Sequence, residues 1–147
     1  MGSSCPLCDP ALAPVLREAR FWRVVLNRNQ NLLGKTMLVL GRHVEDVTQL
    51  TPAEWEELHA MLGWTKRCLD MAFRPDHFNY AFLQNVDRHV HLHVIPRYAG
   101  LREFAGASFD DSDYPGHYRV PSPPRVLADD ALAAIAHAVA QEGHPAG

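Results

Sequence analysis

One short run of residues constrains this chain more than any other, because His89, His91 and His93 alternate with Val90 and Leu92. Alternation of this kind predicts a β-strand, and the side-chain period of two in a strand places the three imidazoles on one face. The opposite face is then apolar and suits a hydrophobic core. The plainer interpretation is a half-buried strand whose polar face happens to be histidine. We favour a functional row, because neutral histidine offers a strand surface little that threonine or lysine would not.

A row of three imidazoles can bind a metal ion or act on an anion. Neighbours on one strand face lie about 7 Å apart, whereas zinc needs nitrogens at about 2.0–2.1 Å, so the three cannot all converge on one ion. One or two of them could ligate a metal with help from elsewhere. A central histidine flanked by two others is better suited to a phosphate, whose oxygens the outer pair can contact.

The rest of the chain predicts an α+β fold, with a long helix packed on an antiparallel sheet. Residues 21–27 and 35–40 read as the first two strands, and the Asn-rich connection between them ends in Gly34, as a hairpin connection should. Residues 77–84 and 89–95 read as two further strands. Their short separation predicts an antiparallel hairpin with a tight connection.

A long helix is predicted between the two strand pairs. Thr51 has the character of an N-cap, Pro52 suits the first helical position, and Glu54 stands where a capping box needs it. Apolar residues then keep helical spacing, with Cys68 at a core position, until Arg74 and Pro75 end the helix. The glutamates of the first turn are predicted to be solvated, namely Glu54, Glu56 and Glu57.

The C-terminal part, residues 99–147, is predicted to be a long loop followed by a helix. From Tyr98 to Pro124 the composition turns to Gly, Pro, Asp and Ser, and an alanine-rich helix follows at about 129–141. The loop segment Gly116-His117-Tyr118 could lie over a pocket. With 147 residues, the whole chain 1–147 is expected to form a single domain.

Charge and composition narrow the classes of partner. The net charge of −3 gives no electrostatic case for nucleic acid or an anionic membrane, and no apolar stretch is long enough to span a bilayer. The N-terminus lacks a basic region followed by an apolar one, and the cysteines number three. These features predict a reducing compartment, and we expect the cytoplasm.

The second informative motif is the pair Cys5 and Cys8, separated by two residues. A redox-active pair would sit at a helix N-terminus after a strand, and Pro10 and Pro14 argue against that context. Two thiolates at this spacing form half of a Cys₂His₂ metal site. The plainer alternative is two ordinary thiols in an N-terminal tail.

The triad run resembles the signature of the histidine triad family of nucleotide hydrolases and transferases. Further segments resemble this family, and together they span roughly residues 20–105: Leu26-Asn27, residues 34–40, Gly41-Arg42-His43, Asn79, residues 84–87 and Ile95-Pro96-Arg97-Tyr98. Ile95 stands where the phosphorylase and uridylyltransferase branches have Gln. The resemblance is therefore to the hydrolase branches, above all to those that act on dinucleoside polyphosphates.

The resemblance implies the histidine triad fold and a structural zinc ion. Its zinc-bearing members pair an N-terminal cysteine knuckle with two histidines, which correspond here to His43 and His89. Cys5, Cys8, His43 and His89 are therefore the expected zinc ligands, and residues 1–20 the knuckle segment. With His89 on the metal, His91 is expected to be the nucleophile and His93 a donor to a phosphate oxygen. A backbone carbonyl or another acceptor should hold the second nitrogen of His91.

The resemblance also implies a nucleotide site. Leu26 and Phe21 are expected to contact the base and Asn27 the ribose, although a turn role is the plainer interpretation of Asn27. Asn79 is expected to donate to a phosphate or to the ribose. Gln84 is expected near the phosphates, although it suits a turn equally well. Arg97 could reach outer phosphates or simply be solvated. The remaining histidines are predicted to lie on the surface: His59, His77, His117, His137 and His144.

The function implied is cleavage at the α-phosphate of a dinucleoside polyphosphate or related nucleotide, through a nucleotidyl-histidine intermediate. The alternatives are a nucleoside phosphoramidate hydrolase and a non-catalytic nucleotide-binding protein. Members of the family usually pair through a helix and an edge strand, so we expect a homodimer. Trp55, Leu58, Met61, Leu62 and Trp64 supply more apolar surface than one helix face needs, and Trp64 is the expected dimer contact.

Overall fold

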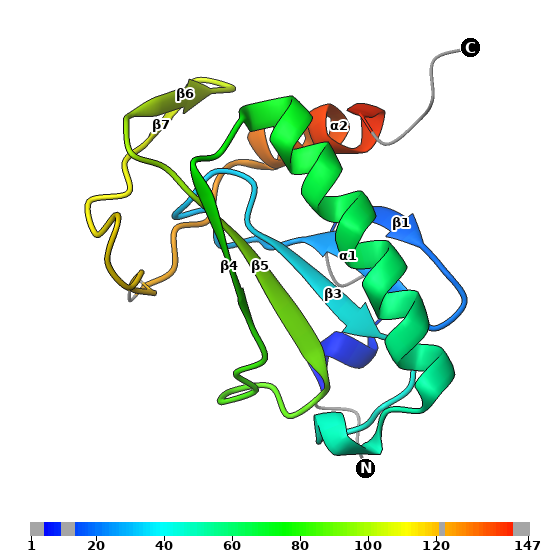
Figure 1. The fold of residues 1–147 in the computed structure, drawn as a ribbon. Helices are drawn as coiled ribbons and strands as arrows, with labels where there is room; N and C mark the ends of the chain where they lie inside the picture. The colour runs from blue at the N-terminus through cyan, green and yellow to red at the C-terminus, as the bar shows by residue number, and fades with distance from the viewer. Residues whose placement is uncertain (1–4, 10–13, 121–122, 143–147) are drawn as a thin grey trace.

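A five-stranded antiparallel sheet carries a long helix across one face, and a second helix lies beside the first (Figure 1). The structure, a computed structural model, describes residues 5–9, 14–120 and 123–142. Pro10, His144 and parts of the predicted segments 1–20 and 99–147 lie outside these ranges. The strands are β1 (Val15–Glu18), β2 (Trp22–Leu26), β3 (Thr36–Leu40), β4 (His77–Ala81), β5 (His91–Arg97), β6 (Arg102–Phe104) and β7 (Ala107–Phe109). The helices are α1 (Pro52–Phe73) and α2 (Asp129–Glu142), with 3₁₀ turns at Pro6–Cys8 and Val47–Gln49.

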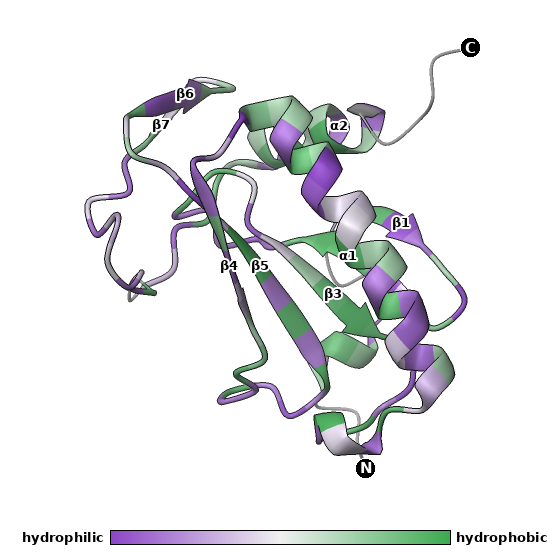
Figure 2. Cartoon of the chain, in the orientation of Figure 1, coloured by the Kyte–Doolittle hydropathy of each residue, from purple (hydrophilic) through white to green (hydrophobic). Residues whose placement is uncertain are grey.

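The sheet has the order β1-β2-β3-β5-β4, which confirms the predicted α+β fold. Its register places Val39 beside His91, Met37 beside His93, and Ala81 on the other side of His93. Residues paired across antiparallel strands share a face, so these side chains surround the two histidines. Figure 2 shows the alternation of hydrophobic and hydrophilic bands along β5.

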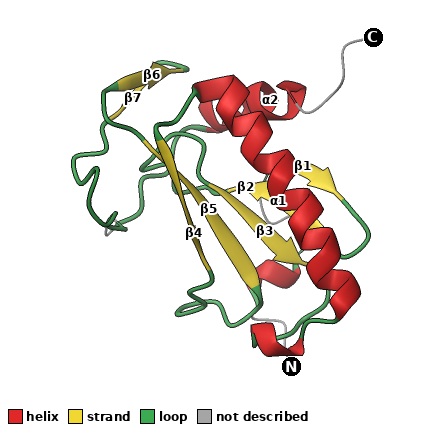
Figure 3. Ribbon diagram, in the orientation of Figure 1, coloured by secondary structure: helices red, strands yellow, loops and turns green. Residues whose placement is uncertain are grey.

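The structure departs from the predicted strands in three places. β1 was not expected, because its four residues do not alternate and its register shifts between Val15 and Arg17. The connection between β4 and β5 takes residues 82–90, so the predicted tight hairpin turn is wrong and His89 precedes the strand. The predicted loop after Tyr98 contains the hairpin of β6 and β7, whose turn uses positive φ at Ala105 and Gly106. Beyond β7 the chain is mostly loop until α2 (Figure 3).

The main core fills the space between the sheet and the two helices. Val90, Leu92 and Val94 lie in it, which confirms the predicted apolar face of the triad run. Cys68 is also buried there, as predicted. Trp64 is only 8 % exposed, packs in the same core, and has the Arg17 guanidinium 5.1 Å from its ring centroid. The prediction of Trp64 as a dimer contact is therefore wrong, because its ring is already covered within the chain.

The start of α1 confirms the capping box but corrects its surroundings. The Thr51 hydroxyl accepts from the Glu54 amide at 3.2 Å, and the Glu54 carboxylate accepts from the Thr51 amide at 2.8 Å. That carboxylate is buried and also accepts from Arg42 Nε at 2.7 Å. The Glu57 carboxylate accepts from the amides of Phe21 and Trp22 at 2.7 and 2.9 Å. The prediction of solvation is thus wrong for Glu54 and Glu57.

No helix in the described ranges is long and apolar enough to cross a lipid bilayer. The histidines predicted to lie on the surface are exposed where the structure describes them, namely His59, His77, His117 and His137.

The Glu54 carboxylate should make stability sensitive to acid. Hydrogen bonds from Arg42, together with the Thr51 amide, lower the pKa of Glu54 to about 2. Because the carboxyl group is more acidic folded than unfolded, its stabilisation is complete above about pH 4.5 and lost as the pH falls toward 2. We expect Glu54→Gln to lower the free energy of unfolding at pH 7 by about 1–3 kcal/mol. Urea unfolding is measured at pH 7, 4.5 and 3. The free energy of unfolding of Glu54→Gln should fall less steeply with acid than that of the wild type.

Glu56→Gln is the matched control, because Glu56 lies exposed in the same helical turn. It should change stability by no more than about 0.5 kcal/mol. An acid dependence of Glu54→Gln equal to that of the control would contradict the assigned role of Glu54.

Candidate functional site

A chain of hydrogen bonds links the three histidines of the triad run. His89 Nε2 lies 2.7 Å from the carbonyl oxygen of Leu40, and His91 Nδ1 lies 2.7 Å from the carbonyl oxygen of His89. His91 Nε2 in turn lies 3.1 Å from His93 Nε2. A carbonyl can only accept, so His89 Nε2 and His91 Nδ1 both carry the proton. The expectation that a backbone carbonyl holds the second nitrogen of His91 is confirmed.

This arrangement assigns the tautomers of the two strand histidines. With its proton on Nδ1, neutral His91 has a lone pair on Nε2, and His93 Nε2 must donate to it. Burial lowers the pKa of His93 to about 4, with smaller contributions from His91 and Lys35. His93 is therefore a neutral N–H donor near pH 7. The pair can offer one nucleophilic nitrogen and one hydrogen-bond donor to the same ligand atom or group.

The side chain of His89 points to a different cluster. The ligand atoms of Cys5, Cys8, His43 and His89 all lie within 4.8 Å of one another. Cys8 Sγ lies 3.4 Å from both His43 Nδ1 and His89 Nδ1, Cys5 Sγ lies 3.5 Å from His89 Nδ1, and the two Nδ1 atoms are 3.2 Å apart. Tetrahedral bonds of about 2.3 Å to sulfur and about 2.0–2.1 Å to nitrogen give S–N and N–N separations of about 3.5 and 3.3 Å. The four side chains could therefore hold a metal ion with little movement.

The hydrogen-bond partners and the burial of the two cluster histidines favour the protonation state that binds a metal ion. His89 donates its Nε2 proton to Leu40, and His43 Nε2 lies 3.3 Å from Glu45 Oε2, so each Nδ1 can face the cluster unprotonated. Burial also lowers the pKa of His89, which favours the neutral form that a metal requires. The loop between the cysteines is tied to the sheet by Arg23, which donates to the carbonyl of Leu7 at 2.7 Å.

A cavity of about 450 Å³ opens beside the two strand histidines, and we call it the triad cavity. His91, His93 and Met37 lie on the sheet face beneath it, and Leu7 of the cysteine loop forms one wall. Leu83 and Val86, from the connection between β4 and β5, form another wall, and Val86 is 90 % exposed. The cavity thus combines polar nitrogens at its base with apolar walls, as sites for planar apolar groups do.

Two of the residues expected at a nucleotide lie at the triad cavity. Asn27 lines it, and its Oδ1 also accepts from the Asn29 amide at 2.9 Å, so the turn role is present as well. Gln84 lines it too, while its side-chain amide donates to the carbonyl of Glu45 and its φ is 51°. Both residues therefore stabilise the loops that border the triad cavity as well as lining it.

Three other expected residues lie elsewhere. Leu26 is fully buried in the main core, on the sheet face opposite to His91, so its side chain does not reach the triad cavity. Phe21 packs against the same core. Asn79 lies on the histidine face but beside Ile95, two residue pairs further along the strands than His93. Its Oδ1 accepts from Arg97 Nη1 at 2.8 Å.

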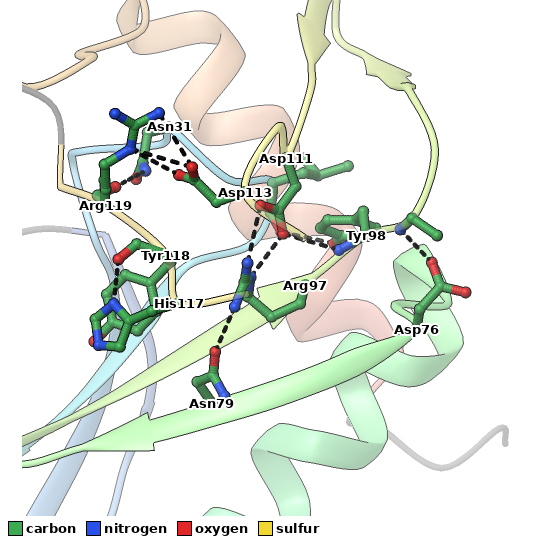
Figure 4. A network of polar contacts seen from close by, with 12 residues as sticks. Asn31, Asp76, Asn79, Arg97, Tyr98, Asp111, Asp113, His117, Tyr118 and Arg119 are labelled. Atoms are coloured by element: carbon green, nitrogen blue, oxygen red, sulfur yellow. Dashed lines mark hydrogen bonds and ion pairs between the residues drawn. The ribbon is translucent and has the colours of Figure 1, made fainter. Parts of the chain in front are cut away.

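Arg97 holds the C-terminal loop (Figure 4). It is buried and donates to Asp111 through Nε at 2.7 Å and Nη2 at 3.1 Å, and its Cζ lies 5.8 Å from the ring centroids of both Tyr114 and Tyr118. Asp111 also accepts from the Tyr98 amide. The expectation of an outer-phosphate contact or simple solvation is wrong for this guanidinium, because a buried charge needs a fixed counter-charge. As a result, Gly116-His117-Tyr118 lies beside Asn79 and Arg97 and does not cover His91.

Sequence reasoning missed several residues that shape the site. Leu7, Leu83 and Val86 are apolar residues in loops, where periodicity carries no signal, and Leu7 is buried against Val25, Met37 and Val39. Asp111 lies in an acidic run that reads as solvated loop. One sequence signal could have found Leu7, Leu83 and Val86, namely a single apolar residue next to a metal-ligand or turn motif.

Comparison with known proteins identifies the fold. No protein-family model matches the chain, and no curated protein matches it. Solved structures do match. A histidine triad protein from Sinorhizobium meliloti is 19 % identical with a TM-score of 0.71, and the match covers 87 % of each chain. A histidine triad protein from Marinobacter aquaeolei is 22 % identical with a TM-score of 0.71, covering 87 % of this chain and 86 % of that one.

A third match concerns the metal. The structure of a Zn-bound histidine triad family protein from Mycobacterium smegmatis is 21 % identical with a TM-score of 0.64, and the match covers 94 % of each chain. All three matches cover 87 % or more of this chain. The chain therefore has the fold of the histidine triad family.

Proposed function

We propose that this protein is a nucleotide hydrolase or nucleotidyl transferase that cleaves its substrate at the α-phosphate. The observation that supports this proposal best is the unprotonated Nε2 of His91 at the base of the triad cavity, in a ring that the His89 carbonyl orients. Nε2 attacks the α-phosphorus, an N–P bond forms, and the bond from phosphorus to the leaving group breaks with its electron pair on the leaving group. Water, or another acceptor in a transferase, then displaces His91 from phosphorus.

His93 assists through the proton on Nε2. In the free protein this proton is directed at His91 Nε2, 3.1 Å away. When His91 forms the N–P bond its lone pair is used, and the His93 N–H can turn to a non-bridging phosphate oxygen. A fixed donor aimed at charge that grows in the transition state lowers the barrier. The apolar walls of the triad cavity suit a nucleobase, with Asn27 near the ribose and Gln84 near the phosphates.

Replacing His91 should remove turnover but not ligand binding. We expect His91→Gly to lower the rate of cleavage of diadenosine tetraphosphate by about a thousandfold or more, because the covalent step is lost. The affinity for adenosine monophosphate should stay within about threefold, since a smaller side chain leaves the walls intact. Product release followed by chromatography and binding followed by calorimetry are the two measurements.

His59→Ala is the control for this experiment, because His59 is exposed on α1. Near-normal turnover by His91→Gly would contradict the covalent mechanism. Adenosine phosphoramidate is assayed alongside, and faster cleavage of it would favour the phosphoramidate alternative. A wild-type protein that binds nucleotide but cleaves neither substrate would be a non-catalytic binding protein.

The cluster of Cys5, Cys8, His43 and His89 suits a single zinc ion. Two thiolates and two imidazoles at tetrahedral separations form the ligand set of structural zinc sites, and four protein ligands leave no open position for substrate. When bound, zinc would tie the N-terminal loop to His89 and so fix the carbonyl that orients His91. The same loop carries Leu7, a wall of the triad cavity. Metal binding should therefore affect both stability and nucleotide affinity.

Metal removal provides the test. We expect about one equivalent of zinc per chain in protein purified without chelators, measured by elemental analysis. Cys8→Ser should lose the metal, lower the melting temperature by about 5 °C or more, and weaken nucleotide binding. Cys68→Ala is the control, because it perturbs the buried core of α1 yet should retain the metal. Absence of metal from the wild type, or unchanged stability in Cys8→Ser, would refute the zinc assignment.

We also propose that two copies of the chain pair through β4 and α1. β4 is an edge of the sheet, and exposed edges are commonly covered by another chain. Trp55 on α1 and Tyr80 on β4 are each 43 % exposed, and Trp55 packs edge-to-face on Phe82. These aromatic groups form an apolar surface beside the free edge, which suits a two-fold contact.

Light scattering at micromolar concentration should give the mass of two chains. Trp55→Asp should shift the population toward the monomer, because it places a charge in the contact. Val15→Asp is the matched control, since Val15 is 41 % exposed on β1, at the opposite edge of the sheet from β4. A wild-type protein with the mass of one chain would rule out the dimer.

A further inference from the structure

Lys35 is a buried lysine on the same face of the sheet as the two strand histidines. It directly precedes β3, and its carbonyl oxygen accepts from the Asn27 amide at 2.9 Å, so the extended backbone begins one residue before the strand. Met37 pairs with His93, and side chains alternate along a strand, so Lys35 lies on the face of Met37 and His93. Both of these neighbours line the triad cavity, whereas Lys35 is only 4 % exposed.

The ammonium group of Lys35 forms no ion pair with a carboxylate of the described residues. Its Nζ donates to Asn31 Oδ1 at 2.7 Å, and this acceptor is neutral. Apart from the histidines, the other buried acidic and basic side chains in the described part of the chain each belong to an ion pair, and these are Glu54, Arg97 and Asp111. A buried charge without a counter-charge costs folding free energy, and it points to an anion that binds nearby.

The carboxylates on the neighbouring C-terminal loop do not supply this counter-charge. The loop lies close, because the carbonyl of Arg119 accepts from Asn31 Nδ2 at 3.2 Å. Asp111 and Asp113 are each paired with an arginine, however, and Asp110 is exposed. The other titratable groups on the neighbouring elements carry no negative charge near neutral pH, namely Arg28, His91, His93 and Tyr118, whose pKa burial raises.

The charge of Lys35 already acts on the two strand histidines. After burial and His91, it is a further cause of the low pKa of His93, which is about 4. The field of the ammonium group therefore reaches the base of the triad cavity, and a phosphate bound there carries the opposite charge and is attracted by the same field. Burial lowers the pKa of Lys35 to about 8, so most molecules keep the ammonium charge at pH 7.

We infer that the ammonium group of Lys35 is the counter-charge of the phosphate that binds at His91 and His93, and that it acts through the protein interior without lining the cavity. The inference rests on the proposed function and adds a positioning residue to it. The phosphate brings the negative charge that the folded protein does not give Lys35, so nucleotide binding stabilises the protonated form of this side chain. Adenosine has the base and the ribose without the phosphate, and it gains nothing from Lys35.

The first experiment compares these two ligands. Adenosine and adenosine monophosphate are titrated calorimetrically into the intact wild-type protein, into Lys35→Met, which keeps the length of the side chain without its charge, and into Lys66→Met. Lys66 is the matched control, because it is half-exposed on α1 and paired with Asp70. We expect Lys35→Met to lose about tenfold in affinity for the monophosphate and less than about twofold for adenosine. Lys66→Met should change neither affinity by more than about twofold.

The second experiment measures the proton that accompanies binding. At pH 8 about half of the Lys35 side chains are deprotonated, whereas the monophosphate is already fully ionised. We expect the wild type to take up as much as about half a proton per adenosine monophosphate bound, measured by calorimetry in two buffers of different ionisation enthalpy. Lys35→Met should take up less than about a tenth of a proton. This measurement on the wild type decides the inference even if the variant fails to fold.

Thermal unfolding separates a role in binding from a role in folding. The pKa of Lys35 is lower in the folded chain than the usual value of about 10.4, so its charge costs stability at pH 7 and this cost disappears as the pH rises from 8 toward 10.4. Lys35→Met should therefore keep or raise the melting temperature at pH 7 while it loses nucleotide affinity. A melting temperature lower by about 5 °C or more, with equal losses for adenosine and the monophosphate, would show a structural role and overturn the inference.

The remaining outcomes distinguish the inference from the proposed function. Equal affinity changes for the two ligands, or no proton uptake by the wild type at pH 8, would overturn the role of Lys35 and leave the proposed function intact. A wild-type protein that binds no adenosine monophosphate and cleaves neither diadenosine tetraphosphate nor adenosine phosphoramidate would overturn the proposed function, and the inference with it.

Discussion

The hydrogen bond from His91 Nδ1 to the carbonyl oxygen of His89 is the contact on which the arrangement of the two strand histidines depends. It sets the tautomer of His91, and through the 3.1 Å contact with His93 it sets the direction of that donor as well. The carbonyl is itself fixed, because the His89 ring lies buried between the Leu40 carbonyl and the cysteine loop. His89 thus belongs to the Cys5, Cys8, His43 and His89 cluster through its side chain and is linked to the His91–His93 pair through its backbone.

The two faces of the sheet are stabilised in different ways. On the helix face, one large core of residues from α1, α2 and the strands excludes water and needs no further partners. On the histidine face, small clusters are completed by loops, with Leu7 packed on Val25, Met37 and Val39, and Tyr118 packed with Ile95 and Leu32. The cysteine loop is held by the hydrogen bond from Arg23 to Leu7 and by the cluster of Cys5, Cys8, His43 and His89. The C-terminal loop is held by the Arg97–Asp111 ion pair. Rigid strands with loop-built walls are a common way to combine precise chemistry with an adaptable pocket.

The Arg97–Asp111 pair shows why the C-terminal loop could not be placed from its composition. A buried ion pair costs desolvation free energy and persists where each charge is fully hydrogen-bonded, as Nε, Nη1 and Nη2 of Arg97 and both oxygens of Asp111 are here. The partners lie fourteen residues apart, and the hairpin of β6 and β7 separates them. Residues 115–118, which follow this contact in the chain, line a cavity of about 400 Å³ together with His77, Asn79 and Tyr80 of β4.

The sequence by itself determined those strands and helices that have a periodic apolar pattern or clear end signals. Alternation predicted the triad strand and its apolar face, and the capping box with Arg74-Pro75 predicted both ends of α1, because these depend on neighbours within a few residues. The cysteine spacing and the family resemblance gathered the four side chains of the metal cluster, which the structure brings within 4.8 Å. Only the tertiary structure decided which side chains reach His91. Strand register turned Leu26 to the core and placed Asn79 two residue pairs beyond His93. Long-range contacts buried Trp64, Glu54 and Arg97, since burial and charge pairing depend on residues that are distant in the chain.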